Sequence, residues 1–424
     1  MGPLLYHERG RVHMAIREPI TRWRWARKTF QVPKEMAAAS ATLWLYLRQT
    51  PWNRENLNIL LNDQALETLE PDTYPQDNWV WHSVHLLASA LRVGKNIVTL
   101  HSESLTRSGW SVGVELGHAQ PMSAISFDRG CSWNADGIAD IGGGEYVVRL
   151  RSHAKVPPDP VPQLVYEQSD HPRLREWRDL VPAAIRDISD RAAQLTALRA
   201  WVSRCWRHQS QGTVYTPWDA PTILDWTRRQ QTVDGVPIAM CVHYGSLFAS
   251  LCMTLGHTTR CVVTTGAIGE PNGHFMVEVW DPARSAWQLH DPNTDTHYVD
   301  PHVLSAVEVH ERVLAGQSLH ELIRRTADAA PLSPGHQQFY DDQVLTGNTF
   351  RHLALWRSND FVSSPTSAPL AHGSVGYVET DLIWFVAPTA QDMAMFPYRI
   401  MDRDFFTAPP HATASAAAAQ GDAT

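Results

Sequence analysis

The chain has 424 residues and a formal net charge of −8 at pH 7, with 43% hydrophobic and 19% charged residues. This length favours two or three domains. The acidic balance gives no electrostatic reason to expect a nucleic acid or an anionic membrane as a partner. No apolar run reaches membrane-spanning length, and the first nine residues lack the apolar core of a secretion signal, so the sequence predicts a cytoplasmic protein.

Cysteine usage limits the chemistry further. Five cysteines are few and odd in number, which argues against a disulfide scaffold and for free thiols in a reducing compartment. The sequence contains no CxxC pair and no HExxH motif. We therefore expect neither a metal site nor a cofactor.

The first part of the chain is dominated by β-strand signals. Residues 1–26 are mixed and are expected to form an N-terminal extension. Residues 27–153 contain short alternating segments separated by regular turn signals, and residues 41–47 alternate most clearly. Many short strands of this kind are typical of a β-sandwich or jelly roll.

The pattern of this region is similar to that of a galactose-binding-type jelly roll, a module that accompanies glycoside-processing enzymes. The similarity rests on residues 43–44, 60–62, 81–84 and 91–96. It implies that the domain docks a carbohydrate through exposed aromatic side chains, for which the candidates are Trp79, Trp110 and Trp133. The alternative is an inert domain whose tryptophans belong to its core.

A proline cluster at 156–162 separates this region from the next, because prolines cannot continue a helix or a central strand. We place a linker at 154–172. Residues 174–207 then have the three- and four-residue apolar spacing of an amphipathic helix. A second domain of α+β type is expected at 173–330, so the fold class is multidomain α+β.

The strongest chemical signal begins at Cys241, which opens an apolar helical run that ends at Gly256. The free backbone amides and the dipole of a helix N-terminus stabilise a thiolate, so Cys241 is a candidate nucleophile. His274 opens a later alternating segment, and Asp291 closes the next one. A thiol, an imidazole and a carboxylate are the parts of a nucleophilic catalyst.

Strand register explains how the last two residues could meet. If Trp280 lies opposite Trp287 in a hairpin, Asp291 is a diagonal neighbour of His274 on the same face of the sheet. A register slip of one residue would present His290 instead.

Residues 240–248, 255–263, 274–280 and 287–292 resemble the motifs of the transglutaminase-like superfamily of cysteine enzymes. The resemblance covers residues 195–300 and implies a papain-like α+β core. It implies Cys241 as nucleophile, His274 as base and acid, and Asp291 as the group that orients the imidazole. It also suggests Trp206 as a stabiliser of the transition state. One departure is Ala239, since the family usually has glycine two residues before the cysteine.

Further residues are candidates for substrate contacts, namely Trp218, His243, Tyr244 and Glu278. For Glu278 the alternative is a strand carboxylate with a structural ion pair. Residues 331–408 are expected to form a small C-terminal β-rich segment that could wall the cleft, with candidate lining by Arg351, His352, Arg357 and Asp360. Residues 409–424 are rich in alanine without periodicity, and we expect a disordered tail.

The sequence thus favours a thiol-dependent hydrolase or acyl transferase that attacks an amide or acyl carbon through a thioester. Its substrate would be a protein, a peptide or a glycoconjugate. One alternative is a carbohydrate- or glycoconjugate-processing enzyme that uses the jelly roll for glycan docking. Another is a non-catalytic binding scaffold. Calcium-dependent cross-linking is disfavoured because no acidic loop resembles a calcium site.

Overall fold

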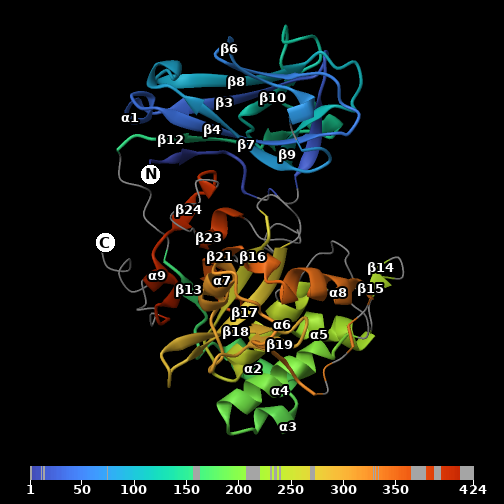
Figure 1. The fold of residues 1–424 in the computed structure, drawn as a ribbon, viewed down its shortest axis with the longest axis vertical. Helices are drawn as coiled ribbons and strands as arrows, with labels where there is room; N and C mark the ends of the chain where they lie inside the picture. The colour runs from blue at the N-terminus through green and yellow to red at the C-terminus, as the bar shows by residue number, and fades with distance from the viewer. Residues whose placement is uncertain are drawn as a thin grey trace.

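The computed structural model describes residues 2–10, 12, 15–73, 75–155, 163–206, 220–229, 232–233, 236–237, 240–267, 273–327, 329, 331–332, 334–363, 379–385 and 393–410. Within them an N-terminal body of two β-sheets is followed by a body in which helices cover an eight-stranded sheet (Figure 1). No helix in these ranges is both long and apolar enough to cross a membrane.

The N-terminal body consists of two antiparallel sheets around one apolar core. The seven-stranded sheet contains β1 (Leu4–Leu5), β2 (Ile16–Ile20), β4 (Ala41–Gln49), β7 (Val80–Leu86), β9 (Trp110–Leu116), β11 (Gly144–Tyr146) and β12 (Val148–Ser152). The five-stranded sheet contains β3 (Trp25–Val32), β5 (Leu57–Leu61), β6 (Gln64–Leu69), β8 (Gly94–Ser102) and β10 (Ser123–Ser126). The short helix α1 (Lys34–Ala37) links β3 to β4. Inward-facing residues alternate with outward-facing ones along β3, as a half-buried strand requires.

Two features of this body differ from the sequence predictions. The expected N-terminal extension contributes β1 and β2 to the larger sheet, where Ile20 of β2 is buried opposite Trp110 of β9. Trp110 cannot dock a carbohydrate, because its side chain is fully buried and its indole N–H donates to the Glu55 carbonyl at 2.8 Å. Trp79 stacks on Tyr46, and Trp133 lies under the Arg27 guanidinium, so both are half-buried.

The second body is built on the sheet order β20 (Ile323–Arg325), β19 (Thr296–Tyr298), β18 (Ala286–Asp291), β17 (Gly273–Asp281), β16 (Thr259–Thr265), β21 (His352–Trp356), β23 (Leu382–Phe385) and β24 (Tyr398–Ile400). One face packs on α6 (Cys241–Thr254) through Phe275, Val277 and Val279. Behind α6 lie α2 (Pro172–Trp177), α3 (Ala183–Arg186), α4 (Arg191–Ser203) and α5 (Ala220–Arg229).

The opposite face of the sheet packs on α7 (Ala306–Leu314) through residues such as Met276 and Leu289. The chain then forms α8 (Pro334–Phe339), a π-helical turn (Tyr340–Leu345) and α9 (Arg403–Thr407). Short pairings complete the body: β13 (Val165–Tyr166) with β22 (Ser358–Asn359), and β14 (Thr232–Val233) with β15 (Val236–Pro237).

The C-terminal residues are part of this second body. The sequence predicts a separate small segment at 331–408, but β21 pairs directly with β16, and β23 and β24 extend the same sheet. The expected linker at 154–172 contains β13, while residues 156–162 and most of the expected tail lie outside the described residues.

The same C-terminal residues contact the N-terminal body. Arg149 and Arg151 of β12 are buried and donate to the carbonyls of Met395 at 2.7 Å and Ala394 at 2.8 Å, respectively. Arg149 also pairs with Glu8. Figure 1 shows β23 and β24 on the side of the second body that meets the sandwich.

Candidate active site

Cys241 is the first residue of α6, preceded by Met240 in an extended conformation. The backbone N–H of Met240 donates to Nδ1 of His243 at 3.1 Å, which fixes the chain just before the helix. The remainder of α6 is buried on all sides, as expected of a helix between a sheet and other helices. The Cys241 side chain is only half-buried, so its thiol lies where a buried helix reaches the surface.

A close approach between α6 and β17 brings Cys241 to His274. Gly245 lies one turn after Cys241, and a Cβ built there would lie 2.4 Å from Cδ1 of Phe275. Only glycine permits this separation. Because Phe275 directly follows His274, the contact fixes the start of α6 beside the start of β17.

His274 is joined to Asp291 across the hairpin of β17 and β18. The two strands pair with Trp280 opposite Trp287 and Val277 opposite His290, which is the register that the sequence predicts. Nε2 of His274 and Oδ2 of Asp291 are 2.8 Å apart. The alternative residue, His290, faces α6 instead, with its ring 5.5 Å from that of Phe248.

Asp291 is completely buried and fully hydrogen-bonded. Its Oδ1 accepts from the Asn293 backbone N–H at 2.9 Å, and its Oδ2 accepts from the Thr294 hydroxyl at 2.6 Å. Burial raises the pKa of this carboxyl, but the charge of His274 and these hydrogen bonds outweigh it and lower the pKa below its ordinary value. The site therefore holds an ionised carboxylate.

The electrostatics of His274 follow from its two neighbours. Burial lowers the pKa of the imidazole, but the charge and hydrogen bond of Asp291, together with the hydrogen bond and charge of Cys241, raise it to about 10. Since Nε2 is taken by Asp291, Nδ1 remains for the sulfur. The imidazole is therefore held between a carboxylate and a thiol, with one ring nitrogen toward each.

A buried arginine, Arg199, holds the turn after Asp291, and the sequence patterns did not predict it. Arg199 of α4 donates through Nε to Asp295 at 2.8 Å, and through Nη1 to Nδ1 of His290 at 3.3 Å and to His297. Burial, followed by the charge of Arg199, lowers the pKa of His290 well below its ordinary value and that of His297 to about 3, so both stay neutral acceptors. One feature of the sequence could have identified Arg199, because it is a charged residue on the apolar face of the predicted helix.

A second unpredicted group covers the imidazole. The Phe339 ring of α8 lies 5.2 Å from the His274 ring, and Nε2 of His336 is 3.0 Å from the side-chain nitrogen of Asn293. Burial, then the charge of His274, lowers the pKa of His336 to about 4. The cover leaves His274 only 2% exposed, whereas the Cys241 side chain is half-buried.

The structure places the expected substrate contacts in the interior. His243, Tyr244 and Glu278 are each 0% exposed, so none of them faces a substrate here. Glu278 instead accepts from Arg260 at 2.6 Å and from the Ala306 N–H at 2.7 Å, which is the structural alternative.

Trp206 is also buried, and its ring lies 4.2 Å from that of Tyr244, one turn beyond Cys241. Trp218 and Ala239 lie outside the described residues.

The remaining cysteines have other environments. Burial raises the pKa of Cys205 to about 12 and raises the pKa values of Cys252 and Cys261 well above the ordinary value, so these thiols stay protonated. Cys131 is exposed on the N-terminal body. Within the described ranges, no cluster of three or more His, Cys, Asp or Glu side chains is arranged to hold a metal ion.

Comparison with known proteins agrees with this geometry at the level of the family. Residues 178–292 match the Transglutaminase-like superfamily, and this segment contains Cys241, His274 and Asp291. No curated protein matches the sequence of the chain.

Two solved structures are similar to the chain. A candidate cysteine protease from Cytophaga hutchinsonii has 12% identity and a TM-score of 0.22, over 64% of this chain and 75% of that one. The transglutaminase of red sea bream has 13% identity and a TM-score of 0.20, over 67% of this chain and 50% of that one.

Proposed function

We propose that the transglutaminase-like domain at residues 178–292 is the core of a thiol-dependent hydrolase or acyl transferase that acts through Cys241, His274 and Asp291. The observation that carries the proposal is the continuous contact from a half-buried thiol at a helix start, through a buried imidazole, to a buried carboxylate. A thiol that has given its proton to an adjacent imidazole is a nucleophile at neutral pH.

In the proposed reaction Cys241 has given its proton to His274, which leaves a thiolate beside an imidazolium before the substrate is attacked. The thiolate attacks the acyl carbon of an amide or ester, and the carbonyl oxygen becomes an oxyanion. When this intermediate collapses, the bond to the leaving group breaks, and imidazolium gives the proton to the departing amine or alcohol. The product of this half-reaction is a thioester on Cys241. Asp291 stays ionised and pairs with the imidazolium.

The second half-reaction releases the acyl group. Neutral His274 takes a proton from water, or from an amine acceptor, as that nucleophile attacks the thioester. Hydrolysis then gives the acid and transfer gives a new amide, while the proton returns to the cysteine sulfur. We favour hydrolysis of a protein, peptide or glycoconjugate amide.

Stabilisation of the oxyanion is assigned to the start of α6. The first amides of a helix have no intrahelical acceptor, so the N–H of Cys241 is available beside its own sulfur. Trp206 is proposed as a supporting group, because its ring packs on Tyr244 one turn from Cys241.

The direct test is a screen of amide substrates with wild type beside Cys241→Ala. Wild type should release the leaving amine and accumulate a thioester adduct at Cys241, detectable by mass spectrometry. Activity that survives in Cys241→Ala would rule out Cys241 as the nucleophile. Absence of any adduct would favour a binding scaffold.

A second role is proposed for the N-terminal body, as a galactose-binding-type jelly roll that docks the carbohydrate part of a substrate. Two packed antiparallel sheets and half-buried Trp79 and Trp133 support it. The full chain should bind members of a glycan array, and Trp133→Ala should bind them less. If wild type binds no glycan, this role is lost and the thiol chemistry is unaffected.

A further inference from the structure

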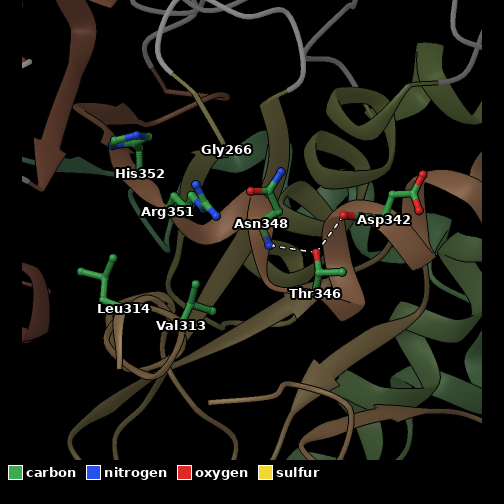
Figure 2. A pocket seen from close by; sticks show the side chains of 8 residues that line it. All are labelled: Gly266, Val313, Leu314, Asp342, Thr346, Asn348, Arg351 and His352. Atoms are coloured by element: carbon green, nitrogen blue, oxygen red, sulfur yellow. Dashed lines mark hydrogen bonds between the residues drawn. The ribbon is translucent and has the colours of Figure 1, made fainter. Parts of the chain in front are cut away.

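A second feature of the catalytic body is a hollow of about 710 Å³ that contains none of the proposed catalytic side chains. Its lining includes Gly266 directly after β16, Val313 and Leu314 from α7, and Asn348, Arg351 and His352 at the start of β21 and just before it (Figure 2). This volume is within the range of small-molecule and side-chain binding sites.

The hollow and the proposed reaction centre are built on neighbouring strands of one sheet. Thr264 of β16 is paired with His274 on one side and with Leu353 of β21 on the other. Neighbouring strands are about 4.8 Å apart, so Leu353 and the adjoining His352 lie roughly 10 Å from the His274 backbone. An extended substrate advances about 3.4 Å per residue, and about three residues therefore span this separation.

The wall of the hollow is held tightly against β16. The hydroxyls of Thr264 and Thr349 are 3.2 Å apart, and a Cβ at Gly266 would lie 2.9 Å from the side-chain nitrogen of Asn348. Thr346 donates to the Asp342 carbonyl at 2.7 Å and accepts from the Asn348 N–H, as the dashed lines in Figure 2 show. The hollow is consequently shaped before any ligand enters.

Its chemistry is divided between two sides. Arg351, His352 and Asn348 lie along one side, and the aliphatic side chains of Val313 and Leu314 lie along the other (Figure 2). The Arg351 side chain is exposed and has no ion pair or side-chain hydrogen bond to another residue within the described ranges. A guanidinium binds a carboxylate through two parallel hydrogen bonds.

The ligand that fits both sides is a carboxylate on an aliphatic stem. Asp342 at the far end of the hollow disfavours a second negative charge on the same ligand. We propose that this hollow is a subsite for one carboxylate-bearing residue of the acyl substrate, about three residues from the scissile bond, with Arg351 as its counter-ion. The assignment to the substrate rests on the proposed function, whereas carboxylate binding by the hollow does not.

The test uses full-length Cys241→Ala protein, so that no turnover occurs. The probes are blocked single residues, N-acetyl-glutamate methylamide and N-acetyl-glutamine methylamide, which differ in one carboxylate. NMR of arginine side-chain Nε–H signals reports binding. The glutamate probe should shift the Arg351 signal in a saturable way and bind at least about threefold more tightly than the glutamine probe, as suits a solvent-exposed ion pair.

Two variants test whether Arg351 is responsible for the preference between the probes. Arg351→Gln should abolish the preference for the glutamate probe. Arg312→Gln should retain it, because Arg312 adjoins Val313 in the chain but is paired with Asp300. Equal binding of the two probes, or a preference that survives in Arg351→Gln, would overturn the proposal.

Failure here and failure of the proposed function are separable. If the hollow binds the glutamate probe but Cys241 forms no thioester, the subsite exists without the chemistry. If the thioester forms but the probes do not discriminate, the chemistry stands and the subsite is lost.

Discussion

Nε2 of His274 lies 2.8 Å from Oδ2 of Asp291, across a hairpin in which both side chains are at most 2% exposed. The partner on the other side of the imidazole is Cys241. A buried carboxylate that is itself held by two further hydrogen-bond donors keeps the imidazole in one orientation. In the proposed mechanism this pair determines whether the thiol is activated.

Asp291→Asn should lower the rate of thioester formation by roughly a hundredfold or more, because the imidazole loses both its orientation and the charge that favours imidazolium. The measurement is single-turnover acylation followed by mass spectrometry. Asp281→Asn, at the other end of β17, is the matched control and should keep the wild-type rate. Equal rates in Asp291→Asn and wild type would contradict the role given to Asp291.

The protonation of His274 should depend on its partners. Because its pKa is raised to about 10, imidazolium should persist well above the ordinary value near 6.5, as followed by ¹⁵N NMR. Removing the charge in Asp291→Asn leaves burial as the stronger influence, so the pKa should fall. The contribution of His274 to the stability of the fold is therefore complete below about pH 6.5 and is lost as the pH rises toward 10. A His274 pKa near 6.5 in both proteins would rule out this coupling.

Arg199→Met should slow acylation, because the turn that carries Asp291 loses its buried anchor. Arg260→Met is the control, since Arg260 is equally buried and paired, but with Glu278 away from this turn. Breaking either pair should cost about 3–5 kcal/mol of unfolding free energy. Chemical denaturation should show similar losses of unfolding free energy in the two variants. Among the molecules that remain folded, only those of Arg199→Met should be acylated more slowly than wild type. Arg199→Lys should recover part of the rate, since lysine keeps the charge but lacks the planar fork.

Gly245→Ala tests whether the approach of α6 to β17 positions the thiol. The added Cβ would collide with the Phe275 ring, so the helix must move, at a cost of about 1–3 kcal/mol. Alkylation of Cys241 should slow as its sulfur leaves His274. The double variant Gly245→Ala with Phe275→Leu restores space and should regain much of the rate. Unchanged alkylation in the single variant would show that this contact does not set the geometry.

Local patterns allowed the positions of the proposed catalytic residues in the fold to be predicted. The alternation of β17 and β18 and the pairing of Trp280 with Trp287 placed Asp291 beside His274, and the apolar run to Gly256 placed Cys241 at a helix start. Hairpins and helix ends depend on neighbours in the chain, so single-sequence patterns describe them well.

Contacts between distant parts of the chain could not be predicted in the same way. Arg199 is 96 residues from Asp295, and Phe339 reaches His274 from a helix beyond the whole hairpin. Likewise β21 gives no sign in its own residues that it pairs with β16. Strand partners and buried ion pairs are chosen by tertiary packing, which leaves no periodic signal in the sequence.

The most direct test of the central claim is the rate at which iodoacetamide alkylates each cysteine between pH 6 and 7, measured by peptide mass spectrometry. Exposed Cys131 serves as the internal reference, since its free thiol is accessible to the reagent. We predict that Cys241 reacts about tenfold faster than Cys131 or more, and that His274→Gln removes the advantage. A Cys241 that reacts no faster than Cys131, or equally fast without His274, would contradict this prediction.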